Sequence, residues 1–175
     1  MTDVSQPGIR TAMELPNWNN RSWVTASMIN PALVAASLVA AANTFESESE
    51  DGMPWELAFL VAPMALHRDT REALPTRVDS HASKWVTEHA ALLATLPGRI
   101  VSMRPYTREG LRYGLRSGSL SLTGEGLLLG RPEWKLNKTR DPELTYIVGR
   151  AAFLGRWFAH VGSPATLFAL LGVQP

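Results

Sequence analysis

Cysteine is absent from the 175 residues of this sequence. Its absence excludes disulfide bonds, a thiolate nucleophile and a metal ion held by thiolates. A chain without cysteine is typical of a reducing compartment, and we therefore expect a cytoplasmic protein.

The sequence also lacks an apolar run long enough to span a bilayer. Its longest apolar stretch, residues 31–42, covers about 12 residues, whereas a membrane-spanning helix needs about 20. Such a stretch suits a buried core helix, so we expect no membrane partner. Residues 1–16 lack a basic segment followed by an apolar core, and we interpret them as a flexible polar lead rather than a signal peptide.

Motifs of common catalytic and metal sites are missing as well. The chain has no HExxH sequence and no glycine-rich loop followed by lysine at the spacing of a P-loop. His81 and His89 stand eight residues apart, which alone defines no ligand set. We expect no catalytic residue, no metal site and no cofactor, so that any nucleotide hydrolysis would reside in a partner.

Positive charge is concentrated in one part of a nearly neutral chain, whose net charge is +1. Residues 98–140 hold nine basic side chains and three acidic ones, an excess of six positive charges. An uneven distribution of this kind indicates a surface that faces a polyanion.

Helix starts marked by proline organise the chain. Asn30-Pro31, Pro54 and Asp141-Pro142 place a capping residue or a proline where a helix begins. We expect helices at residues 31–45, from 54 onward, at about 80–96, and at 105–117, 141–160 and 165–171. The sequence further predicts a solvated acidic loop after the first helix and a short strand at residues 99–103.

Two short apolar segments, residues 119–122 and 126–129, flank Thr123-Gly124-Glu125, and glycine at this position favours a β-hairpin. A helix followed by a hairpin is typical of winged-helix domains. We therefore predict a mainly α fold with a small β-hairpin, a winged-helix-like single domain with C-terminal helices over residues 30–175. Residues 1–29 would form a flexible N-terminal lead.

Arginines recur at four-residue spacing along the helix predicted at residues 105–117, which places them on one face. Guanidinium groups on one face, with tyrosines nearby, can follow a nucleic-acid backbone. The predicted DNA-facing residues are Arg104, Arg108, Arg112, Arg116, Lys135 and Lys138. Two alternatives are open: a solvated face on which Glu109 relieves the repulsion between Arg108 and Arg112, and a face for the acidic surface of a protein partner.

Small and large side chains alternate in the segment that begins at Tyr146. Gly149, Ala152 and Gly155 allow another backbone to come close, while bulky side chains project elsewhere. Because aromatic anchors dominate many protein interfaces, we predict a partner interface here. Its residues are Phe153, Arg156, Trp157 and Phe168.

Several motifs, taken in their order and spacing, resemble those of a known family. They are Asn30-Pro31-Ala32, residues 55–67 (WELAFLVAPMALH), 70–75 (TREALP), Trp85, 107–111 (TREGL), 153–157 (FLGRW) and 163–172 (SPATLFALLG). Over most of residues 30–175 the chain looks like the middle component of bacterial three-component ABC systems.

This resemblance implies a small non-enzymatic winged-helix adaptor that works with an SMC-like ABC ATPase and a third effector component. Systems of this kind are proposed to defend against phage or other invading DNA. Double-stranded DNA is then a further candidate partner, and a homodimer is left open. The alternatives are a stand-alone winged-helix DNA-binding regulator and a small hydrolase built on His67 and Asp69.

Overall fold

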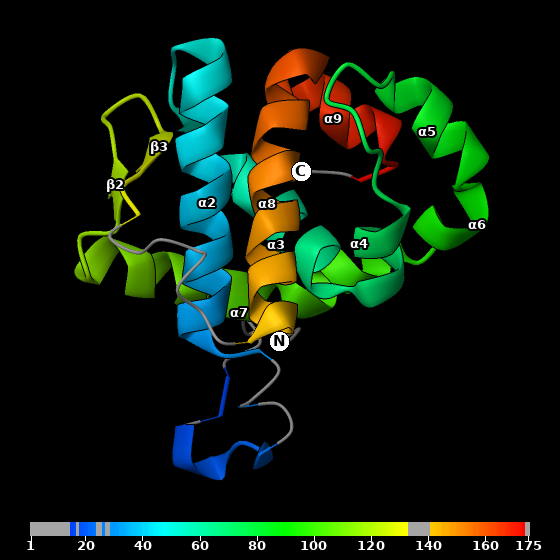
Figure 1. Cartoon of the computed structure of the whole chain (residues 1–175). Coiled ribbons are helices and arrows are strands. Elements are labelled where there is room, and N and C mark those ends of the chain that lie inside the picture. Colours follow the sequence, from blue (N-terminus) through cyan, green and yellow to red (C-terminus); the bar gives the residue numbers. More distant parts are fainter. Residues whose placement is uncertain (1–14, 17, 24–25, 27–28, 133–140, 174–175) are drawn as a thin grey trace, which may run out of the picture.

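The computed structural model describes residues 15–16, 18–23, 26, 29–132 and 141–173 (Figure 1). Its helices are η1 (Trp18–Asn20), α2 (Pro31–Ser49), η2 (Trp55–Leu57), α3 (Ala58–Leu66), α4 (Arg68–Ala73), α5 (Ala82–Glu88), α6 (Ala90–Leu93), α7 (Leu96–Arg116), α8 (Pro142–Val161) and α9 (Pro164–Leu170). Its strands are β1 (Met53–Pro54), β2 (Leu120–Leu122) and β3 (Leu127–Gly130). The chain is thus mainly helical with a small sheet, as predicted.

Helix α2 begins where the sequence predicts it and ends later. The side chain of Asn30 accepts a hydrogen bond of 2.8 Å from the amide of Ala32, and Pro31 occupies the first turn. The predicted acidic loop is wrong over its first residues, because the helix continues to Ser49. Within this last part, the hydroxyls of Ser47 and Ser49 donate to carbonyls four residues earlier.

Helix α2 is buried on most sides, and three other elements approach it closely through glycines. A Cβ atom on Gly155 of α8 would lie 2.1 Å from the carbonyl oxygen of Ala41. A Cβ on Gly110 of α7 would lie 2.4 Å from a methyl group of Val34, and Gly130 of β3 touches the same helix one turn further on. Figure 1 shows α2 and α8 side by side, and the most extensive packing between elements joins these two helices.

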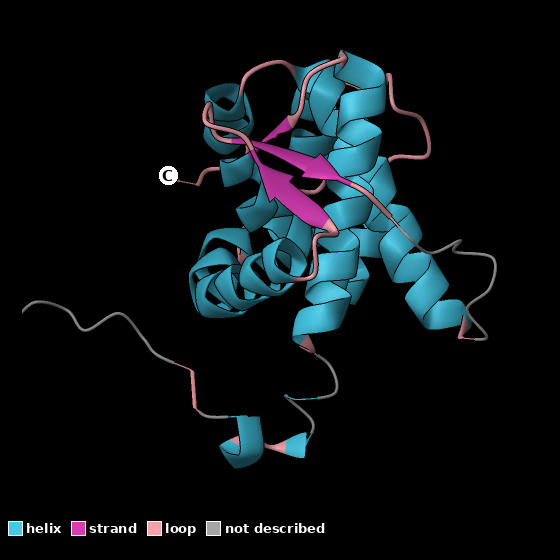
Figure 2. Ribbon diagram, turned by 90° about the vertical axis from the view of Figure 1, so that its left-hand side faces the viewer, coloured by secondary structure: helices cyan, strands magenta, loops and turns pink. Residues whose placement is uncertain are grey.

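The sheet covers one side of α2 (Figure 2). Strands β2 and β3 form the predicted antiparallel hairpin, with Leu120 opposite Gly130. Strand β1, which the sequence did not predict, pairs with the other edge of β3, so that the strand order is β1-β3-β2. The structure therefore contains a three-stranded antiparallel sheet rather than an isolated hairpin.

Residues 99–103, predicted as a strand, belong to helix α7. Leu96 and Ile100 are buried at helical spacing, and Pro97 sits in the first turn, where its missing amide is tolerated. The helix predicted at about 80–96 is divided into α5 and α6, which His89 separates. Among the described residues, we find no helix with the length and apolar content that a membrane span requires.

Replacing Gly155 with alanine tests the close contact between α2 and α8. The added methyl group would collide with Ala41, and overpacking of this kind costs about 1–3 kcal/mol. Gly149 on the same helix has open space around its Cβ position, so Gly149→Ala should be neutral or should gain up to about 1 kcal/mol of helix propensity. Urea unfolding of both variants measures the difference, and equal stability would contradict the packing described here.

Candidate functional site

Helix α7 divides its side chains between the core and the surface. Ile100, Thr107, Gly110 and Gly114 are buried on its inner face. Four arginines at four-residue spacing are exposed, and none of them makes an ion pair or a side-chain hydrogen bond with any described residue. We call this set the α7 arginine row: Arg104, Arg108, Arg112 and Arg116.

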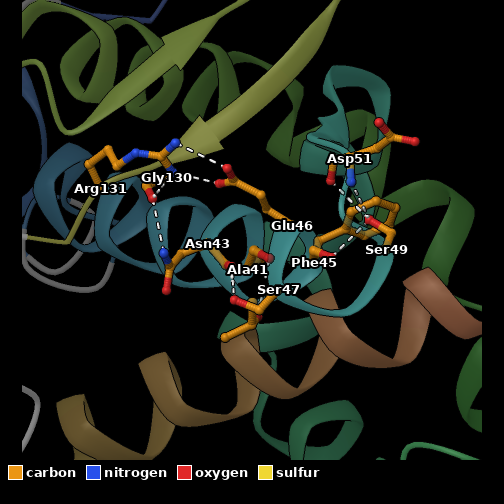
Figure 3. A network of polar contacts seen from close by, with 10 residues as sticks. Ala41, Asn43, Phe45, Glu46, Ser47, Ser49, Asp51, Gly130 and Arg131 are labelled. Carbon is orange, nitrogen blue, oxygen red and sulfur yellow. Dashed lines mark hydrogen bonds and ion pairs between the residues drawn. The ribbon is translucent and has the colours of Figure 1, made fainter.

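The other basic residues of the positive segment are engaged elsewhere or are not described. Arg131 donates to both carboxylate oxygens of Glu46 at 2.5 and 3.0 Å, and these bonds hold the pKa of Glu46 below its ordinary value (Figure 3). Arg99 is partly buried and donates to Thr70. The predicted DNA-facing residues Lys135 and Lys138 lie outside the described residues.

Glu109, the acidic residue within the row, is neutralised by an N-terminal arginine. Arg21 donates to its two carboxylate oxygens at 2.7 and 2.8 Å, and only 6% of the Arg21 side chain is exposed. The guanidinium also lies over the ring of Trp18, 5.1 Å from its centre. Glu109 therefore pairs with Arg21 and not with Arg108 or Arg112. No local pattern in the sequence indicates this contact, which joins residues far apart in the chain.

Two shallow hollows flank the α7 arginine row. The first, of about 260 Å³, includes Arg104 and Arg108 in its lining. The second, of about 410 Å³, is lined in part by Arg112 and Arg116, together with the exposed ring of Tyr113. Successive arginines on a four-residue spacing turn slowly around a helix, so the two ends of the row face different surroundings.

The aromatic residues of the predicted partner interface are buried in the structure. Trp157 is only 1% exposed, and its indole N–H donates to the carbonyl of Ser80 at 2.8 Å. It also packs edge to face on Trp85, with ring centres 5.2 Å apart. Phe153 and Phe168 are buried as well. Arg156 remains half-buried. Large apolar residues at helical spacing are expected in both a core and an interface, so sequence alone does not separate the two.

His67 caps helix α4 and makes no hydrogen bond or ion pair with Asp69. Its Nδ1 atom accepts a hydrogen bond from the amide of Thr70 at 3.2 Å and lies 2.9 Å from the hydroxyl of the same residue. Because Arg99 donates to that hydroxyl oxygen, the hydroxyl proton is free to point at Nδ1. Burial first, and then the nearby charge of Arg99, lower the pKa of His67. In the described part of the chain, no three His, Asp or Glu side chains form a group that could hold a metal ion.

The lowered pKa of His67 makes the stability of the fold sensitive to acid. As pH falls through about 6.5, the unfolded chain takes up a proton on this residue before the folded chain does, so the free energy of unfolding decreases. His67→Asn keeps an acceptor for the Thr70 amide and removes the titration. Between about pH 7.5 and about pH 5.5, the free energy of unfolding should therefore decrease less in the variant than in the wild type. The prediction is wrong if the two lose stability equally.

Fold and site define a small, mainly helical protein that presents a basic helix at its surface. A family model described as "ABC-three component (ABC-3C) system Middle Component 3" matches residues 18–175, and the chain belongs to this family. The match confirms the resemblance seen in the sequence motifs. Comparisons with curated proteins and with solved structures found no matching protein. Membership of the family makes the chain a component of an ABC three-component system.

Proposed function

We propose that this chain is a non-enzymatic, winged-helix-like adaptor that joins an SMC-like ABC ATPase to a third effector component and contacts DNA, in defence against phage or other invading DNA. The family match supports the place in a three-component system. The observation that carries the DNA contact is the α7 arginine row, whose positive charge no described residue neutralises.

The order of elements supports the winged-helix part of the proposal. A helix, an edge strand, two further helices and a hairpin follow one another in a winged-helix domain, and here α2, β1, α3, α7 and the β2–β3 hairpin follow in that order. The strand order β1-β3-β2 also agrees with that arrangement. Helix α7 then corresponds to the recognition helix and the hairpin to the wing. The departure is the insertion of α4, α5 and α6, where a helix-turn-helix motif has a short turn.

The geometry of the row suits phosphate contacts rather than base readout. Arg112 and Arg116 are exposed at one end of the row, about 6 Å apart along the helix axis. Exposed guanidinium groups at this spacing can contact neighbouring phosphates. Binding of this type depends on salt and carries little sequence preference.

Removing two arginines tests the DNA contact. Arg112→Gln/Arg116→Gln should weaken binding to a labelled duplex, because two phosphate contacts are lost. The slope of log affinity against log salt should become shallower by about 1.8. Fluorescence anisotropy over a salt series measures both effects. Arg68→Gln, in α4, removes an exposed arginine that pairs with Glu72 and should change neither the affinity nor the salt slope. Equal loss in this control, or no duplex binding by the wild type at low salt, would overturn the DNA contact.

Arg21 should support DNA binding through Glu109. Arg21→Ala leaves the Glu109 carboxylate unpaired beside the arginine row and should lower affinity for duplex DNA severalfold. Adding Glu109→Gln should restore the affinity, since the uncompensated negative charge is then gone. The same anisotropy assay measures both variants. If the double variant binds duplex DNA as weakly as Arg21→Ala does, Arg21 acts in another way.

Co-expression with the ABC ATPase encoded beside this chain distinguishes an adaptor from a stand-alone DNA-binding regulator. An adaptor co-purifies with the ATPase in a complex of defined mass. A stand-alone DNA-binding regulator, favoured only by the same arginine row, binds duplex DNA by itself and remains alone in co-expression.

A further inference from the structure

An apolar hollow with a basic rim lies between η2, α7 and α9. Its volume is about 260 Å³, and we call it the Trp55 hollow. Five apolar side chains contributed by three parts of the fold line it: Trp55, Phe59, Ile100, Phe168 and Val173. Val173 follows α9, so the lining combines residues of η2, α3 and α7 with the C-terminal end of the described chain.

The ring of Trp55 is held in place and yet left open. The backbone N–H of Trp55 donates to the carbonyl of Gly126 in the hairpin turn at 3.0 Å. Its ring meets Phe59 edge to face, with ring centres 5.9 Å apart. Even so, 43% of Trp55 is exposed.

The opposite wall is set by the end of helix α9. Gly172 adopts a positive φ of 66°, and the amide of Val173 donates back to the carbonyl of Phe168 at 2.9 Å. This is a Schellman motif, in which the residue after the glycine packs on the last turn of the helix. It brings Val173 onto Phe168, and both side chains line the hollow.

The rim of the Trp55 hollow is positively charged. Arg104 and Arg108 line it and have no carboxylate partner among the described residues, whereas Glu56 is the acidic residue in the lining. An apolar floor with two free guanidinium groups at its edge complements an apolar side chain that is flanked by carboxylates.

The hollow lies just below the usual size range of small-molecule pockets. Pockets for cofactors and drug-sized ligands usually measure about 300–1,000 Å³, which is larger than this one. Protein interfaces, by contrast, are commonly anchored by one aromatic or aliphatic residue in a desolvated pocket, with charged groups around it. Phosphate contacts require exposed guanidinium groups but no apolar floor.

We propose that the Trp55 hollow binds an acidic linear segment of another component of the system, whose apolar side chain enters the hollow while its carboxylates pair with Arg104 and Arg108. The proposal rests on the adaptor function above, because it names the surface on which that function depends. It divides the α7 arginine row: the end with Arg104 and Arg108 serves a protein partner, and the end with Arg112 and Arg116 serves DNA.

Peptide binding tests this division. The probes are short, overlapping, fluorescein-labelled peptides that cover the sequences of the two other components, with anisotropy as the readout. We expect the peptides that bind to carry Asp or Glu next to a large apolar residue. Trp55→Ala and Arg104→Gln should each lower the affinity for these peptides by about tenfold or more. Arg116→Gln removes the same charge from the other end of α7 and should leave peptide affinity unchanged.

Co-expression of the same variants distinguishes a failure of this inference from a failure of the adaptor function. If the wild type forms no complex with the ABC ATPase or the third component, the adaptor function fails. If the complex forms but no acidic peptide binds, or Trp55→Ala binds peptides like the wild type, the inference is overturned. It is equally overturned if Trp55→Ala loses affinity for DNA rather than for peptides. Thermal unfolding of Trp55→Ala shows whether the variant is folded, and Arg104→Gln tests the rim without changing the core.

Discussion

The close packing around helix α2 is the constraint on which the rest of the structure depends. Gly110, Gly130 and Gly155 bring α7, β3 and α8 against the backbone or the β-branched side chains of this helix, at distances that leave no room for a Cβ atom. The hydroxyl of Thr44 adds a 2.7 Å hydrogen bond to the carbonyl of Ala152 across the α2–α8 contact. Because Gly110 must face α2, the arginines of α7 must face outward.

The distribution of charge on α7 follows from its packing against α2. Once α7 is oriented, the four arginines of the row form no ion pair with a described carboxylate, and Glu109 is already paired with Arg21. The two ends of the row differ because α9 and η2 surround one end and leave the other open. The two ends of the row therefore border different hollows, one lined by Trp55, Phe168 and Val173 and the other by Pro31 and Tyr113. An adaptor that contacts a protein and a nucleic acid requires two such surfaces.

Much of the helical framework could be predicted from local sequence signals. Asp141 and Ser163 accept hydrogen bonds from amides of the helices that they precede, as capping residues before proline should. Strand β1 could not be predicted, because two residues show no periodicity and their pairing depends on β3. Residues 99–103 could not be assigned to a helix from the sequence, since a short apolar run fits a strand or a buried helix equally well. The four-residue spacing of the arginine row could be recognised in the sequence. The contact of Arg21 with Glu109 and the burial of Trp157 depend on tertiary structure.

Hydroxyl-radical footprinting of the co-expressed complex, with and without duplex DNA, tests most directly whether α7 presents these two surfaces. The exposed rings of Trp55 and Tyr113 report on the two ends of the helix, and that of Tyr146 on α8 serves as a control. We predict that the protein partners protect Trp55 from oxidation, that DNA protects Tyr113, and that Tyr146 reacts as in the isolated chain. Protection of Tyr146, with Trp55 and Tyr113 fully reactive in the complex, would contradict this account of α7.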